Sequence, residues 1–318
     1  MPTILLMQEL KDKYIEQIRQ AAPGWQIVRC QGDDVREEQL REAEIAVGWE
    51  DEWMERVLAD PQARLKWIQN WNAGVDHIPL QTLKEKGVIL TNISGVHPFP
   101  ISESVFAMML GLTRKIHIYV RNQTKRLWAD RANGNEMHGK TLGILGFGTI
   151  GEEIARIARA FDMKVLGYKR TPAASPHADE IYVEGQLREM LVQCDYVVNI
   201  LPLTSKTRRL IDAEKIGWMK PGAYFINVGR GGTVDTEALM EALTSGKLAG
   251  AGLDVFETEP LPPEHPLYDL DNVILTPHNA GGTARYNQRA LDIFLANLRQ
   301  YMAGEAPSIN VIDYDRQY

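Results

Sequence analysis

The chain has 318 residues, and its 35 lysines and arginines against 42 aspartates and glutamates leave a net charge of −7. That length suits two domains with separate cores, and the acidic balance argues against a general nucleic-acid or anionic-membrane partner. The two cysteines, Cys30 and Cys194, form no CxxC or His/Cys pattern, so we expect neither a disulfide framework nor a metal site. No apolar stretch approaches membrane-spanning length, and the first residues do not resemble a signal peptide, which predicts a cytoplasmic protein with a small-molecule ligand.

Short β-like runs alternate with helical segments before residue 98, which predicts a parallel sheet with crossover helices. The expected strands are Thr3–Met7, Trp25–Val28, Ile45–Val47, Leu65–Ile68 and Val88–Leu90. Two prolines, Pro98 and Pro100, then introduce a long helical pattern that we expect to carry the chain out of the first domain. Its apolar face consists of Val105, Met108, Met109, Leu112 and Ile116.

A glycine loop with the sequence GFGTIG lies near the middle of the chain, at residues 146–151. It follows an apolar run and precedes a helical pattern, so the segment predicts a strand, a turn and a helix. In such a unit the first glycine permits the tight turn, the second lets backbone amides approach a pyrophosphate, and the third lets helix and strand pack closely. The sequence therefore predicts a dinucleotide site at the helix N-terminus, formed by Gly146, Gly148, Thr149, Ile150 and Gly151.

A second series of strands begins at this loop and predicts a doubly wound sheet. Its six expected strands are Leu142–Leu145, Lys164–Gly167, Tyr196–Ile200, Tyr224–Asn227, Ala251–Asp254 and Val273–Leu275. A closing helix, with an apolar face of Leu291, Phe294, Leu295 and Leu298, precedes a tail that can return to the first domain. We therefore expect two α/β domains: a discontinuous, flavodoxin-like substrate-binding domain of residues 1–98 and 286–318, and a Rossmann-type dinucleotide-binding domain of residues 99–285.

Polar motifs follow the last three strands of this second series, where an open α/β sheet places its ligands. They are Asn227–Gly232, Asp254–Pro260 and Thr276–Gly282. In the first motif, Arg230 stands between glycines and can present its planar fork to a carboxylate, which suits a 2-oxo acid. The alternative is a surface arginine in a flexible turn.

The other two motifs contain an acid and a base. His278 follows Thr-Pro on a loop and can donate or accept a proton near neutral pH. The alternative is that His278 is an ordinary loop histidine hydrogen-bonded to a neighbour. A carboxylate on the other ring nitrogen would favour the protonated ring, and Glu259 is our candidate. The alternative for Glu259 is a solvated charge in an acidic stretch.

The order GFGTIG, NVGRGG, DVFETEP and TPH resembles the D-isomer-specific 2-hydroxyacid dehydrogenase family over nearly the whole chain, with a pattern similar to its glyoxylate/hydroxypyruvate reductases. The resemblance implies that Arg230 binds the substrate carboxylate, that Glu259 pairs with His278, and that His278 is the acid/base. Residues 72–76 are similar to the family's substrate loop, in which the backbone amides of Ala73 and Gly74 would hold the carboxylate.

The resemblance also implies further cofactor contacts and a quaternary structure. Residues 199–204 are similar to the stretch beside the cofactor, and Asp254 to the residue near the nicotinamide amide; the implied contacts are Leu201, Pro202, Thr207, Val228, Asp254, His278 and Gly281. A homodimer built around the domain-linking helix is the usual assembly. Trp128, just past that helix, would then reach the partner's site, unless it is a core or surface tryptophan.

The end of the second strand in the Rossmann series departs from the NAD pattern. An NAD-binding unit is expected to place Asp or Glu there, bonded to the ribose 2′-hydroxyl. Here the sequence is Tyr-Lys-Arg-Thr, and Lys169, Arg170 and the hydroxyl of Thr171 could neutralise and bond a 2′-phosphate. We therefore predict a preference for NADP(H), with NAD(H) tolerated if the two bases are merely solvated.

These observations predict an NAD(P)-dependent oxidoreductase that reduces small 2-oxo acids, such as glyoxylate or hydroxypyruvate, to D-2-hydroxy acids. Four alternatives remain open at this stage. Three are enzymes, namely a phosphoglycerate, D-lactate or formate dehydrogenase using NAD. The fourth is a dinucleotide-sensing binding protein similar to the family's transcriptional corepressors. The side chain accepted at C3 depends on loops such as Ser94–His97, whose shape periodicity does not reveal.

Overall fold

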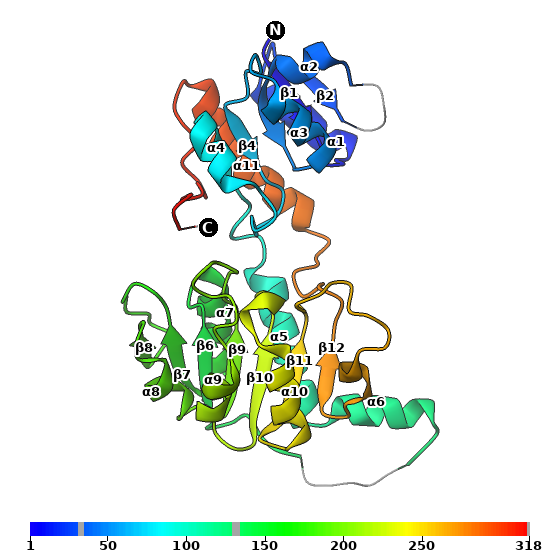
Figure 1. Ribbon diagram of the computed structural model, residues 1–318, viewed down its shortest axis with the longest axis vertical. Coiled ribbons are helices and arrows are strands. Elements are labelled where there is room, and N and C mark those ends of the chain that lie inside the picture. Colours follow the sequence, from blue (N-terminus) through cyan, green and yellow to red (C-terminus); the bar gives the residue numbers. More distant parts are fainter. Residues whose placement is uncertain (31–34, 129–133, 317–318) are drawn as a thin grey trace. The chain divides into compact units, whose positions relative to one another are not determined.

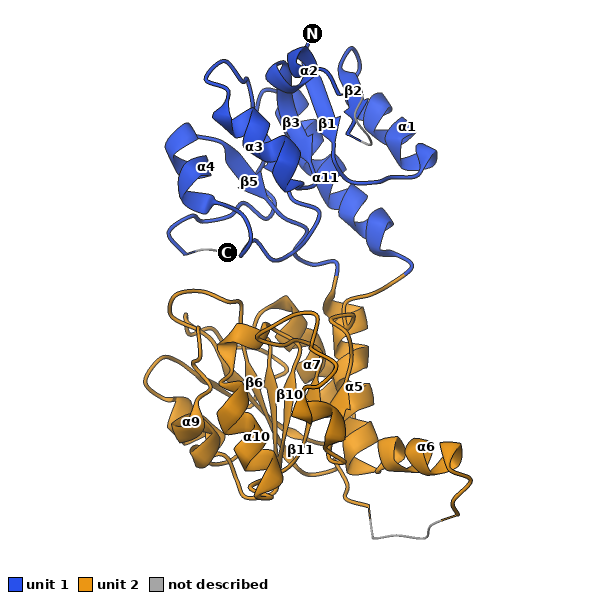
Figure 2. Ribbon diagram, turned by 45° about the vertical axis from the view of Figure 1, so that its right-hand side comes forward, with its two compact units in different colours: residues 1–96, 284–318 blue, residues 97–283 orange. Residues whose placement is uncertain are grey.

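The computed structural model describes residues 1–30, 35–128 and 134–316. The chain divides into two compact units, Met1–Val96 with Ala284–Tyr318 and His97–Thr283 (Figure 2). It therefore crosses between the units twice, and the first unit is discontinuous in sequence. The expected boundaries at residues 98 and 286 lie two residues beyond these crossing points.

The first unit contains a five-stranded parallel sheet (Figure 1). Its strands are β1 (Thr3–Leu6), β2 (Gln26–Arg29), β3 (Ala43–Val47), β4 (Trp67–Gln69) and β5 (Ile89–Thr91). They lie in the order β2-β1-β3-β4-β5, which is the flavodoxin-like order. Helices cover both faces of such a sheet, so most of the side chains on its strands are apolar. Each of the five expected strands is found, with ends shifted by at most two residues.

The first unit's helices are α1 (Asp12–Ala21), α2 (Glu37–Arg41), α3 (Asp51–Ala59), α4 (Leu80–Lys86) and α11 (Tyr286–Met302). Side chains alternate along β1, so that Ile4 packs with α1 and α11 while Leu5 packs with α3 on the opposite face. After α11 the tail returns beside β5, where the Ile312 N–H donates to the Leu90 carbonyl at 2.9 Å. The closing helix and the tail are therefore part of the first unit's core.

The second unit contains a seven-stranded parallel sheet in the order β12-β11-β10-β9-β6-β7-β8. Its strands are β6 (Thr141–Leu145), β7 (Lys164–Tyr168), β8 (Glu180–Tyr182), β9 (Tyr196–Asn199), β10 (Ala223–Asn227), β11 (Leu248–Leu253) and β12 (Val273–Leu275). This is a Rossmann-type order that reverses between β6 and β9. The expectation of six strands was wrong, because the edge strand β8 has only three residues and one buried side chain, too few for an apolar pattern.

Helices cover both faces of this second sheet. They are α5 (Pro98–Thr113), α6 (Ile116–Thr124), α7 (Thr149–Arg159), α8 (Leu187–Leu191), α9 (Ala213–Trp218) and α10 (Thr236–Thr244), with short 3-10 turns η1 (Gly231–Thr233) and η2 (Pro266–Asp269). The α5 helix packs beside α7 in one core, and α8, α9 and α10 pack on the other face. Among the described residues, no helix combines the length and apolarity needed to cross a membrane.

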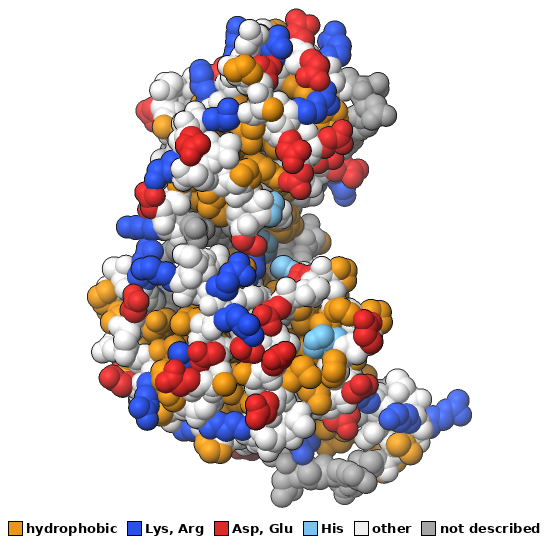
Figure 3. Space-filling view, viewed as in Figure 1, with side chains coloured by type: hydrophobic (Ala, Val, Ile, Leu, Met, Phe, Trp, Pro, Cys, Tyr) orange, Lys and Arg blue, Asp and Glu red, His pale blue; other side chains and the backbone are white. Residues whose placement is uncertain are grey.

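The domain-linking helix is shorter than its apolar pattern suggests. It ends at Thr113, and Lys115 adopts a left-handed conformation with φ of 58°, after which α6 begins. Ile116, expected on the same face as Val105, is therefore 52% exposed. None of the side chains of α6 is buried, and the helix protrudes at the edge of its unit (Figure 2). His117 and Arg121 connect it to residues 271–273 by hydrogen bonds. On the face shown in Figure 3, basic and acidic side chains are interspersed over each unit.

Candidate functional site

The glycine loop joins β6 to α7 as expected. Gly146 has a positive φ of +96°, and its N–H donates to the Tyr168 carbonyl at 3.0 Å. Gly148 is the N-cap of α7 and supplies no side-chain cap, and a Cβ placed on it would meet no heavy atom within 4 Å. Open space therefore lies where the first amides of α7, at Thr149 and Ile150, are available to an anion. This cradle fits a pyrophosphate.

The same loop stands at the point where the strand order reverses, between β6 and β9. Open α/β sheets bind ligands at the carboxyl edge of that point. Leu201 and Pro202 follow β9 there, and Thr207 closes their turn by donating from Oγ1 to the Pro202 carbonyl at 2.6 Å. After β7, the Lys169 N–H donates to the Tyr182 carbonyl at 3.0 Å, and the exposed Arg170 and Thr171 come next.

A buried network of amides, which the sequence patterns did not indicate, supports the loop that carries Arg230. The Nδ2 atom of Asn199 donates to Asn227 Oδ1 at 3.0 Å and to Thr233 Oγ1 at 2.8 Å. Thr233 Oγ1 in turn donates to the Arg230 carbonyl at 2.6 Å, while Asn199 Oδ1 accepts the Leu201 N–H at 3.3 Å. One side chain, Asn199, therefore links the Leu201 stretch to the backbone of Arg230.

The glycines on either side of Arg230 permit close backbone packing between neighbouring loops. A Cβ on Gly229 would lie 2.7 Å from the Leu201 carbonyl oxygen, and a Cβ on Gly231 only 1.9 Å from the carbonyl carbon of Phe256. Neither position can hold a larger residue without displacing the backbone after β9 or β11. Glycine at these positions thus brings the loops that follow β9, β10 and β11 into contact.

Asp254, at the end of β11, is buried and uses both carboxylate oxygens to hold the next loop. Oδ1 accepts from Thr276 Oγ1 at 2.5 Å and from the Asn279 N–H at 2.8 Å, and Oδ2 accepts from the Ala280 N–H at 3.0 Å. The implied position of Asp254 near a nicotinamide amide stays a prediction. In the structure, this carboxylate fixes the loop that carries His278.

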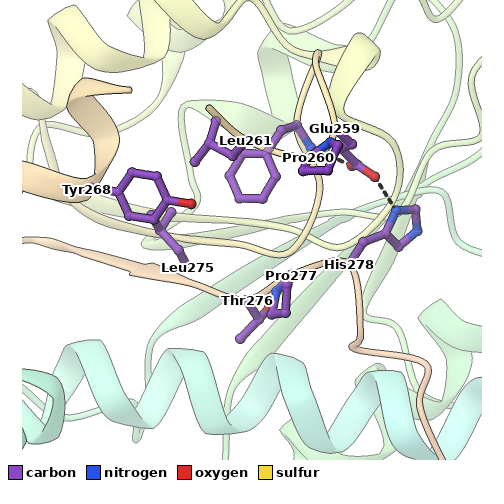
Figure 4. Close-up of a pocket in the computed structure, with 9 residues that line it drawn as sticks. Glu259, Pro260, Leu261, Tyr268, Leu275, Thr276, Pro277 and His278 are labelled. Carbon is purple, nitrogen blue, oxygen red and sulfur yellow. Dashed lines mark hydrogen bonds and ion pairs between the residues drawn. The ribbon is translucent and has the colours of Figure 1, made fainter. Parts of the chain in front are cut away.

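Glu259 and His278 form a hydrogen-bonded pair in which His278 Nδ1 lies 2.6 Å from Glu259 Oε2 (Figure 4). The second carboxylate oxygen of Glu259 accepts the Phe256 N–H at 2.9 Å, so the acid is held at both ends. His278 has φ of 50°, and its own N–H donates to the Asp254 carbonyl at 2.8 Å. With a carboxylate on Nδ1, that nitrogen carries a proton and Nε2 is left for proton exchange.

An apolar pocket of about 510 Å³ lies beside this pair (Figure 4). Its lining residues are Phe256, Glu259, Pro260, Leu261, Tyr268, Leu275, Thr276, Pro277 and His278. Within the described residues, no cluster of three or more His, Cys, Asp or Glu could hold a metal ion.

The remaining predicted residues lie in three places. Ala73 and Gly74 follow β4 in the first unit. In the second unit Val228 is buried, and Gly281 packs against the His97 ring, since a Cβ there would lie 2.7 Å from His97 Cδ2. Trp128, beyond α6, is fully exposed, which rules out a place in the core.

Comparisons with known proteins agree on one family. The family model described as "D-isomer specific 2-hydroxyacid dehydrogenase, NAD binding domain" matches residues 106–280. A glyoxylate reductase of Pyrococcus furiosus is 35% identical over 278 residues, which cover 85% of this chain and 82% of that protein. A D-3-phosphoglycerate dehydrogenase of Methanocaldococcus jannaschii is 34% identical over 84% of this chain, which spans about half (51%) of that protein's length.

A solved structure is similar over the whole chain. It is that of an NADPH-dependent glyoxylate/hydroxypyruvate reductase from Sinorhizobium meliloti, in complex with NADP and sulfate. Its sequence is 29% identical to this chain, and the TM-score is 0.84 over 100% of this chain and 99% of that one.

Proposed function

The chain belongs to the D-isomer specific 2-hydroxyacid dehydrogenase family and is therefore an NAD(P)-dependent oxidoreductase, and we propose that it reduces small 2-oxo acids to D-2-hydroxy acids with NADPH. Glyoxylate and hydroxypyruvate are the proposed substrates, since relatives named for these acids match most of the chain. The observation that carries the proposal is the Glu259–His278 pair, which lies at the carboxyl edge of the same sheet as the glycine loop.

In the proposed reaction His278 is the proton donor. When bound, the reduced nicotinamide supplies a hydride to C2 of the 2-oxo acid. His278 Nε2 gives its proton to the carbonyl oxygen, so that the C=O bond becomes an H–C–OH group and the ring is left neutral. Glu259 holds the ring through Nδ1, which leaves Nε2 as the nitrogen that donates the proton.

The substrate carboxylate requires cationic and N–H donors. We assign these roles to the Arg230 guanidinium, which can bind both oxygens in one plane, and to the amides of Ala73 and Gly74. The proposed substrate domain is the first unit, which contains the two amides, and the proposed cofactor domain is the second, which contains the glycine loop.

The proposed NADPH preference is supported by the residues after β7. Lys169, Arg170 and Thr171 offer two cations and a hydroxyl where an NAD-binding unit needs a carboxylate. The proposed contacts along the rest of the cofactor are the cradle at Gly146–Gly151 and the side chains or backbone of Leu201, Pro202, Thr207, Val228, Asp254, His278 and Gly281.

The proposed assembly is a homodimer that covers α6. Three apolar side chains of this helix, Ile116, Tyr119 and Val120, are 40–53% exposed, and Leu127 and Trp128 just beyond it are more exposed still. A partner subunit would bury them, with Trp128 reaching the partner's site. This assembly and the cytoplasmic location stay predictions.

The test is a steady-state assay of the purified chain with glyoxylate, hydroxypyruvate, 3-phosphohydroxypyruvate and pyruvate, each with NADPH and NADH. We expect the highest kcat/KM with NADPH and one of the first two acids, and loss of turnover in His278→Ala. A preference for 3-phosphohydroxypyruvate with NADH would instead favour a phosphoglycerate dehydrogenase, the second candidate, which the Methanocaldococcus relative supports. Binding of NADPH without turnover of any acid would indicate a dinucleotide-sensing protein.

A further inference from the structure

Two buried asparagines hold the loop that follows β4 in the first unit. The Nδ2 atom of Asn70 donates to the carbonyl oxygens of Asn72 at 3.0 Å and Gly74 at 2.9 Å. Asn92, which follows β5, donates from Nδ2 to the Ala73 carbonyl at 2.6 Å. Three successive carbonyl groups are therefore bound by side-chain amides of the interior.

The direction of these carbonyls determines the direction of the next N–H groups. In a trans peptide unit the C=O and N–H bonds point opposite ways. The Asn72 carbonyl shares its peptide plane with the Ala73 N–H, and the Ala73 carbonyl shares its plane with the Gly74 N–H. Both N–H groups consequently point away from Asn70 and Asn92, and neither has a hydrogen-bond partner within residues 1–30, 35–128 and 134–316.

The cost of this arrangement is visible at Asn70. Its Oδ1 atom is buried and has no hydrogen-bond partner among the described residues. A buried acceptor left unpaired is unfavourable for folding. The Asn70 side chain therefore binds two carbonyl groups of the loop while its own oxygen stays unpaired.

Asn92 is braced by the returning tail of the chain. Its Oδ1 accepts the Ser94 N–H at 2.9 Å, and its own N–H donates to the Asn310 carbonyl at 3.1 Å. Asn310 Nδ2 donates to the Ser94 carbonyl at 2.7 Å. The tail therefore fixes the position from which Asn92 reaches Ala73.

We propose that Asn70 and Asn92 are positioning residues that preset the N–H groups of Ala73 and Gly74 as a two-donor site for the substrate carboxylate. This inference rests on the proposed function and extends it to residues that do not touch the substrate. Donors that already point outward bind an anion without the entropic and reorganisation cost of ordering the loop.

The variant Asn92→Ala tests the proposal, because it frees the Ala73 carbonyl while leaving Arg230 and His278 in place. We expect KM for glyoxylate to rise by about tenfold or more, while kcat at saturation and KM for NADPH stay within about twofold of the wild-type values. This combination indicates the loss of an interaction that is equally strong in the ground state and the transition state. Asn70→Asp should act in the same direction, since a carboxylate oxygen repels the two carbonyls that the amide bound.

Thr3→Val is the control. Thr3 is also buried in the first unit, but it lies at the start of β1, and its hydroxyl donates to the Met1 carbonyl at 3.1 Å. We expect this variant to lower the melting temperature without changing KM for glyoxylate. An unchanged KM in Asn92→Ala, or an equal rise in Thr3→Val, would overturn the proposal.

A second measurement separates this inference from the proposed function. In the 15N-labelled chain with NADP⁺, titration with oxamate, a 2-oxo acid mimic, should shift the amide signals of Ala73 and Gly74 in the wild type and much less in Asn92→Ala. Absence of glyoxylate turnover together with these shifts would refute the proposed function and keep the inference. Turnover without the shifts, or shifts of equal size in Asn92→Ala, would refute the inference.

Discussion

Glu259 and His278 follow different strands, β11 and β12, yet their side chains meet with Nδ1 2.6 Å from Oε2. Each is also tied to the end of β11 through the backbone. Glu259 accepts the Phe256 N–H, and the His278 N–H donates to the Asp254 carbonyl. The pair is therefore set by two neighbouring strand ends, and its geometry does not depend on long, freely rotating segments.

Removal of either member of the pair should reduce catalysis and spare cofactor binding. We expect His278→Ala to lower kcat by about 10²–10⁴-fold, and Glu259→Gln by a smaller factor, because the amide keeps the shape but loses the charge. Stopped-flow kcat and NADPH titration measure both effects. Glu257→Gln is the control, since Glu257 binds the Thr236 N–H and not the histidine; equal losses in Glu257→Gln and Glu259→Gln would make Glu259 an ordinary acidic neighbour.

Two glycine substitutions should separate cofactor binding from folding. Gly148→Ala places a methyl group where no atom lies within 4 Å, so we expect an unchanged melting temperature and at least tenfold weaker NADPH binding, because the methyl occupies the anion's space. Gly231→Ala places its Cβ 1.9 Å from the Phe256 carbonyl carbon and should lower the melting temperature by several degrees. If Gly148→Ala bound NADPH as tightly as the wild type, the glycine loop would not be the pyrophosphate site.

The bases after β7 should determine the choice of cofactor. Lys169→Ala combined with Arg170→Ala should lower kcat/KM for NADPH by about 10–100-fold while changing that for NADH little, since only NADPH carries the 2′-phosphate. The difference in kcat/KM for NADPH between the wild type and this double variant should decrease as salt is added, because salt screens the charge interaction. Lys11→Ala with Lys13→Ala, in the first unit, changes the net charge equally and should leave the ratio unchanged. Equal losses of kcat/KM for NADPH and NADH in the Lys169→Ala, Arg170→Ala variant would mean that these residues do not bind the 2′-phosphate.

Asn199 should couple the two loops that it joins. Asn199→Ala leaves the Leu201 N–H and Thr233 without their shared partner, so we expect the free energy of unfolding to fall by about 1–3 kcal/mol and KM to rise for both NADPH and the 2-oxo acid. Arg230→Lys should raise KM for the acid alone, because lysine lacks the planar fork. If KM rose only for the 2-oxo acid in both variants, Asn199 would have no role in cofactor binding. Urea unfolding and initial-rate kinetics supply these values.

The stability of the first unit should depend on pH through Glu44. Burial raises the pKa of this carboxyl, but hydrogen bonds from Lys66 and Tyr301 and nearby positive charges outweigh it, so the pKa is lowered from 4.5 in the folded chain. A carboxyl whose pKa is lowered by folding stabilises the fold at pH values above its ordinary, unfolded pKa. This stabilisation is lost as the pH falls through the pKa of the folded chain. Glu44→Gln should therefore destabilise the chain at pH 7 and less at pH 3.5, as urea unfolding would show. An equal difference in the free energy of unfolding between the wild type and Glu44→Gln at both pH values would contradict this prediction.

Local patterns account for the parts of the site that lie next to one another in sequence. The glycine loop, Arg230 and His278 each follow an apolar strand, and parallel strands bring their carboxyl ends to one edge of a sheet. The strand β8 and the break at Lys115 escaped prediction because three residues and a single left-handed turn leave no periodic signal. The buried amides Asn70, Asn92 and Asn199 escaped because an isolated asparagine in a sequence does not reveal its partner.

The sequence by itself determined the two alternating series, the place of the dinucleotide loop and the order of the acid, base and arginine motifs, because these depend on periodicity and on neighbours along the chain. Only the tertiary structure decided which atoms meet. It brought Glu259 to His278, packed Gly231 on Phe256, and turned the peptides at Ala73 and Gly74 through Asn70 and Asn92. The reason is physical: a hydrogen bond or a close contact requires positions within a few ångströms, and residues far apart in sequence reach them only when the sheets are assembled.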